Sequence, residues 1–181
     1  MRSDASRDGA GRPLDARGDA EGAEEMNARF GREKSSSATS ASARDLFVSA
    51  ARHYVGVKWR HLGRDPVRGL DCVGLVLRAA QDAGLLAGVR YPSYGRRPEG
   101  HRLTAEVARY ARAVPMSEMA AGDVLTFAGI ERLPCHLAIV TETRPLTTIL
   151  HSWAEHGRVA EHALAGFSGG APTGCWRLAD G

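Results

Sequence analysis

The spacing of apolar residues changes at Asp123, and this change constrains the fold more than any other feature of the sequence. Before Asp123, apolar residues recur every three to four positions, as they do on one face of a helix. After it come five short runs rich in β-branched and aromatic residues, separated by turn residues: DVLTFA, CHLAIVTE, TTILHSW, RVAEHAL and TGCWRL. Helices followed by a meander of strands predict an α+β domain with an antiparallel sheet of about five strands.

The first 43 residues differ in composition from the rest of the chain. They contain no Val, Ile, Trp, Tyr or Cys, and Ala, Ser, Gly, Arg and acidic residues dominate. A segment of this kind buries too little apolar surface to offset the entropy that it loses on ordering. We therefore predict a disordered, low-complexity segment over residues 1–43 and one folded domain over residues 44–181.

Charge and hydropathy argue against several classes of protein. The net charge of +3 is modest and no basic run is interleaved with aromatic residues, so nucleic-acid binding is not predicted. No apolar stretch reaches the roughly 18 residues that span a membrane. The N-terminal residues lack the apolar segment of a secretory signal, so we expect synthesis in the cytoplasm without a signal peptide. The three cysteines are an odd number, which favours free thiols over a disulfide framework.

Two helices are predicted in the first half of the folded domain. In SARDLFVSAARHYVGV, Ser42 and Asp45 have the spacing of a capping box. In DCVGLVLRAAQDAG, Asp71 is the predicted N-cap and Gly84 the C-terminal stop. After a long loop, a further helix is expected over residues 102–113.

Cys72 is the first residue of the second predicted helix, whereas a structural cysteine would be expected on the apolar face in mid-helix. At the first position its sulfur lies near unpaired backbone N–H groups and the positive end of the helix dipole. These surroundings lower the pKa of a thiol and make it a better nucleophile. The charge of the neighbouring Asp71 opposes thiolate formation, so a histidine must supply the compensation. Cys72 is therefore the candidate nucleophile.

Two of the seven histidines lie at the ends of consecutive predicted strands. His136 begins one strand and His151 lies near the end of the next. If the strands pair as an antiparallel hairpin, both imidazoles lie at the same edge of the sheet, where they can face Cys72. The sequence thus predicts Cys72 as nucleophile, His136 as base and His151 as the residue that orients His136.

Four ordered motifs make residues 44–178 resemble the NlpC/p60 cell-wall cysteine peptidases: Asp71-Cys72-Val73-Gly74-Leu75, Gly122-Asp123-Val124, His136-Leu137-Ala138-Ile139-Val140, and His151 in ILHSW. The resemblance implies a papain-like fold in which the nucleophile helix packs on the antiparallel sheet. It also implies a cysteine peptidase that uses no metal or cofactor. The implied substrate is the peptidoglycan stem peptide, cleaved between D-glutamate and the diamino acid.

The segment VGVKWRHLGRDPVRGLDCVGL is most similar to the phage-tail and gene-transfer-agent branch of this family. That likeness implies an enzyme carried to the cell wall by a phage-like tail particle, with tail proteins as partners. The family often has a tyrosine near the oxyanion site where this chain has Trp59, whose indole N–H can donate a hydrogen bond but cannot act as a phenol. Trp59, His61 and Asp71 are the candidate oxyanion and substrate-binding residues.

Arginines in two loops, at 60–68 and 90–102, are candidates to attract the carboxylates of a stem peptide. Planar guanidinium groups suit carboxylates because they form bidentate pairs with them. The alternative is a solvated, arginine-rich surface without a binding role.

Two other functions fit parts of the sequence. A zinc site from Cys72, Cys135, His136, His151 and His156 is disfavoured, because these residues lack CxxC or HxxxH spacing. A non-catalytic structural or binding component of a tail would keep the fold without the activity. The presence of all three candidate catalytic residues argues against that alternative.

The remaining histidines and cysteines of interest receive no chemical role from the sequence. His53 and His162 are expected on a helix face and a strand face. Cys135 and Cys175 lie in predicted strands, where we expect them to pack as small hydrophobic residues.

Overall fold

The computed structural model describes residues 42–179 apart from 92, 98, 100, 130 and 131. The predicted disordered segment therefore lies outside the described residues, except for Ser42 and Ala43, which are the N-cap and the first residue of the first described helix. Within the described part of the chain, no helix is both long enough and apolar enough to cross a lipid bilayer.

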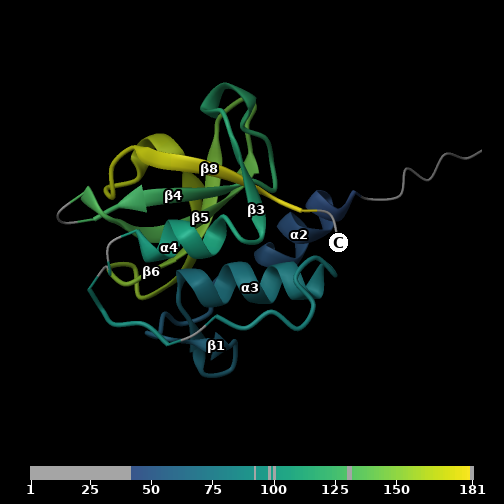
Figure 1. Cartoon of the computed structure of the whole chain (residues 1–181). Coiled ribbons are helices and arrows are strands. Elements are labelled where there is room, and N and C mark those ends of the chain that lie inside the picture. The colour runs from purple at the N-terminus through teal and green to yellow at the C-terminus, as the bar shows by residue number, and fades with distance from the viewer. Residues whose placement is uncertain (1–41, 92, 98, 100, 130–131, 180–181) are drawn as a thin grey trace, which may run out of the picture. The chain divides into compact units, whose positions relative to one another are not determined.

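One antiparallel sheet of six strands forms the centre of the fold, in the order β3-β8-β4-β5-β6-β7 (Figure 1). Its strands are β3 (Ala111–Val114), β4 (Val124–Ala128), β5 (Pro134–Glu142), β6 (Thr148–Trp153), β7 (Arg158–Ala163) and β8 (Pro172–Leu178). Two short 3₁₀ turns follow β3 and β7, at Met116–Glu118 and Leu164–Gly166. The five predicted runs correspond to β4 to β8, so the α+β class and the antiparallel sheet are confirmed.

The sheet has one strand more than predicted, because β3 replaces the end of the helix expected over residues 102–113. The helix α4 (Arg102–Val107) is short, and β3 pairs along its whole length with β8. Ala111 and Val114 are buried while the two residues between them are exposed, a pattern too short to reveal a strand in the sequence. Pairing with β8 outweighs the local helical preference of this segment.

Two helices pack together beneath one face of the sheet, α2 (Ala43–Arg52) and α3 (Cys72–Asp82) (Figure 1). α2 begins at the predicted capping box, in which Ser42 and Asp45 exchange hydrogen bonds. α3 begins directly after Asp71, contacts β5 and β6, and buries most of its residues. The packing of the Cys72 helix on the sheet agrees with the prediction.

The sheet is buried on both faces, and strand alternation decides which side chains meet. Leu137 and Ile139 of β5 pack in the cluster that contains α3, whereas Ala138 and Val140 pack in a second cluster on the other face. His136 shares the second face with Ala138 and Val140, because side chains alternate along a strand. The pairing of β5 with β6 brings His151 to the same face as a diagonal neighbour.

A small hairpin, β1 (Arg64–Asp65) and β2 (Gly69–Leu70), lies against the first turns of α3 and was not predicted. The contact is close because Gly74 has no side chain: a Cβ atom there would lie 1.9 Å from the carbonyl oxygen of Gly63. The glycine of the Asp-Cys-Val-Gly-Leu motif therefore sets how near the hairpin lies to the start of α3. It helps to fix the position of Cys72.

Residues 56–59 run along the outer edge of β7 and pair with its backbone. The N–H of Val159 donates to the carbonyl of Val57 at 2.8 Å, and the N–H of Trp59 donates to the carbonyl of Gly157 at 2.8 Å. Trp59 is thereby anchored at the beginning of β7.

Candidate active site

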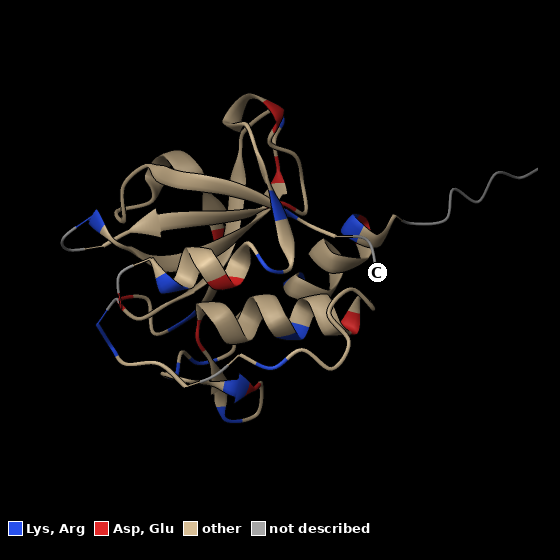
Figure 2. Cartoon of the chain, in the orientation of Figure 1, with Lys and Arg blue, Asp and Glu red and all other residues tan. Residues whose placement is uncertain are grey.

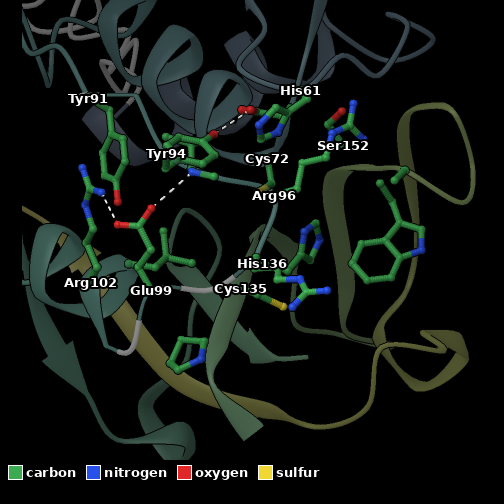
Figure 3. Close-up of a pocket in the computed structure, with 18 of the residues that line it drawn as sticks. His61, Cys72, Tyr91, Tyr94, Arg96, Glu99, Arg102, Cys135, His136 and Ser152 are labelled. Atoms are coloured by element: carbon green, nitrogen blue, oxygen red, sulfur yellow. Dashed lines mark hydrogen bonds and ion pairs between the residues drawn. The ribbon is translucent and has the colours of Figure 1, made fainter. Parts of the chain in front are cut away.

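A cavity of about 190 Å³ opens where the N-terminal end of α3 meets the start of β5 and the end of β6. Its lining comprises Trp59, His61, Asp71–Val73, Tyr91, Tyr94–Arg97, Glu99, Arg102, Leu103, Pro134–His136 and Ser152–Ala154. Cys72 and His136 both contribute side chains to this one pocket (Figure 3). His151 lies behind His136, with none of its surface exposed.

Cys72 occupies the first position of α3, as predicted, but its surroundings do not lower the pKa of its thiol. Burial and the carboxylate of Asp71 raise the pKa of Cys72 to about 12, although hydrogen bonds from the backbone N–H groups of Leu137 and Val73 favour the thiolate. The expectation of a lowered pKa is therefore wrong, because burial and an adjacent negative charge outweigh the partial charge of the helix end. A raised pKa favours the thiol of Cys72 over its thiolate.

The carboxylate of Asp71 is surrounded by hydrogen-bond donors, and only 4% of the residue is exposed. It accepts from the N–H of Gly74 at 2.8 Å, the N–H of Leu62 at 2.7 Å, the hydroxyl of Tyr94 at 2.6 Å and the guanidinium of Arg64 at 2.7 Å. We call these groups the Asp71 cluster. Asp71 lines the pocket, but its oxygens are occupied by the protein, so it caps α3 and anchors the neighbouring loops.

Three histidines form a continuous hydrogen-bonded line on the second face of the sheet. His136 Nε2 lies 2.8 Å from His151 Nδ1, and His151 Nε2 lies 2.8 Å from His162 Nε2. His162 Nδ1 lies 2.9 Å from the carbonyl oxygen of Ala163. We call His136, His151 and His162 the histidine line. The sequence assigned no role to His162, and the structure corrects this by placing it against His151.

The carbonyl of Ala163 sets the direction of each hydrogen bond in the histidine line. A carbonyl oxygen only accepts, so neutral His162 carries its proton on Nδ1 and accepts at Nε2. His151 then donates from Nε2 and accepts at Nδ1, which requires His136 to donate from its own Nε2. The other ring nitrogen of His136, Nδ1, keeps its lone pair and is free to accept a proton.

Burial keeps the first two rings of the line uncharged. Burial and the neighbouring His151 lower the pKa of His136 well below its usual 6.5. Burial, together with His162 and His156, lowers the pKa of His151 to about 3. The ring of Trp153 covers His136 at a centroid distance of 4.4 Å and contributes to this burial. At neutral pH the imidazole of His136 beside the pocket is therefore uncharged.

Trp59 and His61 form part of the pocket wall. The guanidinium of Arg96 lies 5.9 Å from the centre of the Trp59 ring, within the range of a cation–π contact. The imidazole of His61 packs edge-on against Tyr94 at a centroid distance of 5.7 Å. Both candidate residues are thus placed where they can contact a bound molecule.

The loop between α3 and α4 carries arginines to the pocket, and Figure 2 shows basic positions along its path. Arg96, Arg97 and Arg102 all line the cavity, with Arg102 paired to Glu99. In the other arginine-rich loop, Arg64 is bound to Asp71 at 2.7 Å. The loop around residues 90–102 therefore fits the predicted carboxylate-binding surface better than the loop around residues 60–68.

Several residues of the site differ from what the sequence indicated. Cys135 is exposed at the pocket rather than packed, because it lies at the start of β5 before the strand enters the core; Cys175 is buried as expected. Tyr94, which the sequence did not single out, donates its hydroxyl to Asp71. His162 could have been found from the turn at residues 154–157, because a hairpin closing there places it diagonally beside His151.

Solved structures with a similar fold include NlpC/P60 domains. A lipoprotein-like NLP/P60-family protein from Staphylococcus aureus aligns over 77% of this chain and 42% of its own, with 19% identity and a TM-score of 0.55. The peptidoglycan hydrolase RipB from Mycobacterium tuberculosis aligns over 86% of this chain and 68% of its own, with 20% identity and a TM-score of 0.52. The NlpC/p60 domain of the peptidoglycan hydrolase SagA aligns over 75% of this chain and 98% of its own, with 20% identity and a TM-score of 0.52.

The chain thus covers less than half of the Staphylococcus aureus protein but nearly all of the SagA domain. No family model and no curated protein sequence matches it. At identities of 19–20% the likeness establishes the fold alone, and the NlpC/P60 fold that the motifs implied is confirmed.

Proposed function

We propose that this protein is a cysteine peptidase that hydrolyses an amide bond in peptidoglycan stem peptides. The observation that carries the proposal is one pocket holding Cys72 together with a neutral His136 whose Nδ1 keeps its lone pair. The fold supports the substrate class, because RipB and SagA, which share it, are peptidoglycan hydrolases.

The protonated resting state of Cys72 requires proton transfer during attack. His136 accepts the Sγ proton at Nδ1 while the sulfur bonds to the carbonyl carbon of the substrate amide. The tetrahedral intermediate then loses its C–N bond, the imidazolium returns the proton to the leaving amine, and a thioester remains on Cys72. Water, deprotonated by His136, hydrolyses the thioester, releasing the carboxylic acid and restoring the thiol.

The oxyanion of the intermediate requires donors beside Cys72. The backbone N–H of Cys72, at the N-terminal end of α3, is the main proposed donor, because the helix end supplies an oriented partial positive charge there. The indole of Trp59 is the proposed side-chain donor, taking the place of the family's tyrosine. Trp59 and His61 line the same pocket, which supports contact with the substrate.

For the bond cleaved, we propose the one between D-glutamate and the diamino acid. The stem peptide carries carboxylates, and the pocket presents the guanidinium groups of Arg96 and Arg97 to a ligand of that charge. The resemblance of the motifs supports the choice of bond.

Mass spectrometry of purified peptidoglycan after digestion tests these assignments. The wild-type protein is expected to release stem fragments cut at that bond. Cys72→Ala is expected to release none while keeping its circular dichroism spectrum. Fragments cut elsewhere would contradict the bond assignment, and near-normal release by Cys72→Ala would contradict the nucleophile. A wild-type protein that releases no stem fragments would favour a non-catalytic structural or binding role.

Delivery to the wall by a phage-like tail particle is the second part of the proposal, and it rests on the resemblance of residues 55–75. The protein would be made in the cytoplasm and act at the cell wall once the particle attaches. Proteomic analysis of purified particles from producing cells is expected to find the chain among the tail proteins. Its absence from such particles would contradict this part and leave the enzymatic part standing.

A further inference from the structure

A second group of histidines lies behind His136, away from the pocket. His151, His156 and His162 each present one ring nitrogen, and these atoms lie within 4.8 Å of one another. They come from β6, from β7 and from the turn that joins the two strands. Nitrogen ligands of tetrahedral zinc lie about 3.3 Å apart, since each Zn–N bond is about 2.0–2.1 Å. To reach that spacing, His151 Nε2 and His162 Nε2, which lie 2.8 Å apart, would separate by about 0.5 Å, and the exposed His156 side chain would move toward them.

Two of these three imidazoles already aim a ring nitrogen at the group, and His162 also has the tautomer that a metal ligand needs. His162 donates from Nδ1 to the carbonyl of Ala163, which leaves the lone pair of Nε2 facing the group. His151 is held at Nδ1 by His136, and its Nε2 faces the group too. Metal-binding histidines typically make such a second hydrogen bond, because it fixes the ring and its tautomer. Exposed His156 provides the way in from solvent.

We propose that His151, His156 and His162 bind a divalent transition-metal ion of the zinc type, and that binding switches off the peptidase. A three-imidazole donor set suits zinc, with water as the fourth ligand. The binding site stands on the geometry alone. Its inhibitory effect rests on the proposed function, because it acts through His136 as the base.

The inhibition follows from the tautomers of the histidine line. Without metal, His151 donates from Nε2 to His162. A metal ion on that Nε2 needs its lone pair, so the proton of His151 moves to Nδ1. Nδ1 then donates to Nε2 of His136, whose own proton must move to Nδ1. Each ring keeps one proton throughout, but His136 no longer has a lone pair with which to accept the proton of Cys72.

Cobalt(II) binding to the full-length Cys72→Ala variant tests the site. Removing Cys72 prevents metal binding by the catalytic thiol. We expect the visible absorption of tetrahedral Co²⁺, no sulfur charge-transfer band, and displacement by one equivalent of Zn²⁺.

Adding His156→Ala is expected to weaken Co²⁺ binding at least about 10-fold. The matched control is His53→Ala, which removes an exposed histidine at the end of α2 and should leave binding unchanged. A thiolate band, or undiminished binding in the His156→Ala variant, overturns the site.

Imidazole ¹⁵N NMR of Cys72→Ala tests the reversal without any substrate. The proton of His136 is expected on Nε2 in chelator-treated protein and on Nδ1 after one equivalent of Zn²⁺. A His136 tautomer that stays unchanged with zinc bound overturns the switch. Because this measurement needs no turnover, it remains decisive even if the protein proves not to be a peptidase.

With the active protein, Zn²⁺ is expected to inhibit the wild type and His53→Ala equally. His156→Ala should require at least about 10-fold more Zn²⁺ for the same inhibition. Equal inhibition of all three proteins overturns the switch.

Discussion

The Asp71 cluster lies next to Cys72 at the start of α3, the histidine line begins at His136 in the same pocket, and the two groups use different hydrogen-bond chemistry. The carboxylate of Asp71 only accepts and its partners donate to it, so the cluster has a single arrangement. Each imidazole both donates and accepts, so the histidine line has two arrangements that differ in where the protons lie. The first group therefore fixes the start of α3, whereas the second group is able to move protons. Substitutions in the two groups should therefore affect different measurements.

His136→Ala is expected to have the largest effect, and the effect is on turnover. A positioned base contributes about 10²–10⁴-fold, so we expect kcat on stem peptides to fall about 10³-fold while the protein stays folded. His151→Ala should cost less, because it acts only by orienting His136. Steady-state kinetics with circular dichroism as a control checks both. A greater loss in His151→Ala than in His136→Ala would show that the roles are assigned wrongly.

Asp71→Ala is expected to act mainly on stability. It removes the cap of α3 and leaves Arg64 and Tyr94 without their acceptor, so the free energy of unfolding should fall by about 3 kcal/mol. Urea unfolding measures the change. Asp65→Ala is the matched control, since its 3.6 Å pair with Arg68 is exposed and should contribute less than about 0.5 kcal/mol. Similar losses in the two variants would contradict the special position of Asp71.

Acid is expected to destabilise the protein through the histidine line. The folded-state pKa values of His136 and His151 lie below 6.5, so below that pH the unfolded chain binds more protons than the folded one. The stabilisation is complete above about pH 6.5 and is lost as the pH falls toward the folded pKa values. Two such groups predict a loss of about 2 kcal/mol between about pH 7 and 5.5. Denaturation in EDTA buffer measures it, and His151→Gln should reduce the pH dependence by roughly half.

His156→Ala is expected to have the smallest effect. Its ring lies 6.0 Å from that of His151 but belongs to neither hydrogen-bonded group. In chelator-treated buffer we expect kcat within about twofold of the wild type and an unchanged unfolding midpoint. A loss as large as that of His151→Ala would mean that His156, rather than His151, orients the base.

Elements with strong local signals could be predicted from the sequence. Ser42 and Asp71 have the residue types and spacing of helix caps, and the runs that became β4 to β8 are long enough to show their character. The strand β3 and the hairpin at residues 64–70 could not be predicted, because they span two to four residues each and depend on pairing with distant segments. Local sequence carries little information about such pairing.

Some residues of the candidate site could likewise be predicted from the sequence, and others could not. Cys72 and His136 could be selected from motifs and from their places at the ends of elements. His162 can be assigned only once the turn at residues 154–157 is used to fix the β6–β7 register, in which it pairs with Ile149, and the backbone carbonyl of Ala163 carries no sequence signal at all. The sequence predicts a lowered pKa for Cys72, but the pKa is raised. The main cause is burial of the thiol by elements that are far apart in the chain, which local sequence does not reveal.

Residues 56–59 cover the outer edge of β7 and also supply Trp59 to the pocket wall, so the same segment affects both aggregation and the pocket. A strand with an uncovered edge is a template on which another chain can add a strand, and here the covering segment ends in Trp59. A change that detaches Trp59 from Gly157 would expose that edge and remove a wall of the pocket at once. Variants of this segment that lose activity should therefore also aggregate more readily, so their kinetics need to be measured on freshly isolated protein from which aggregates have been removed.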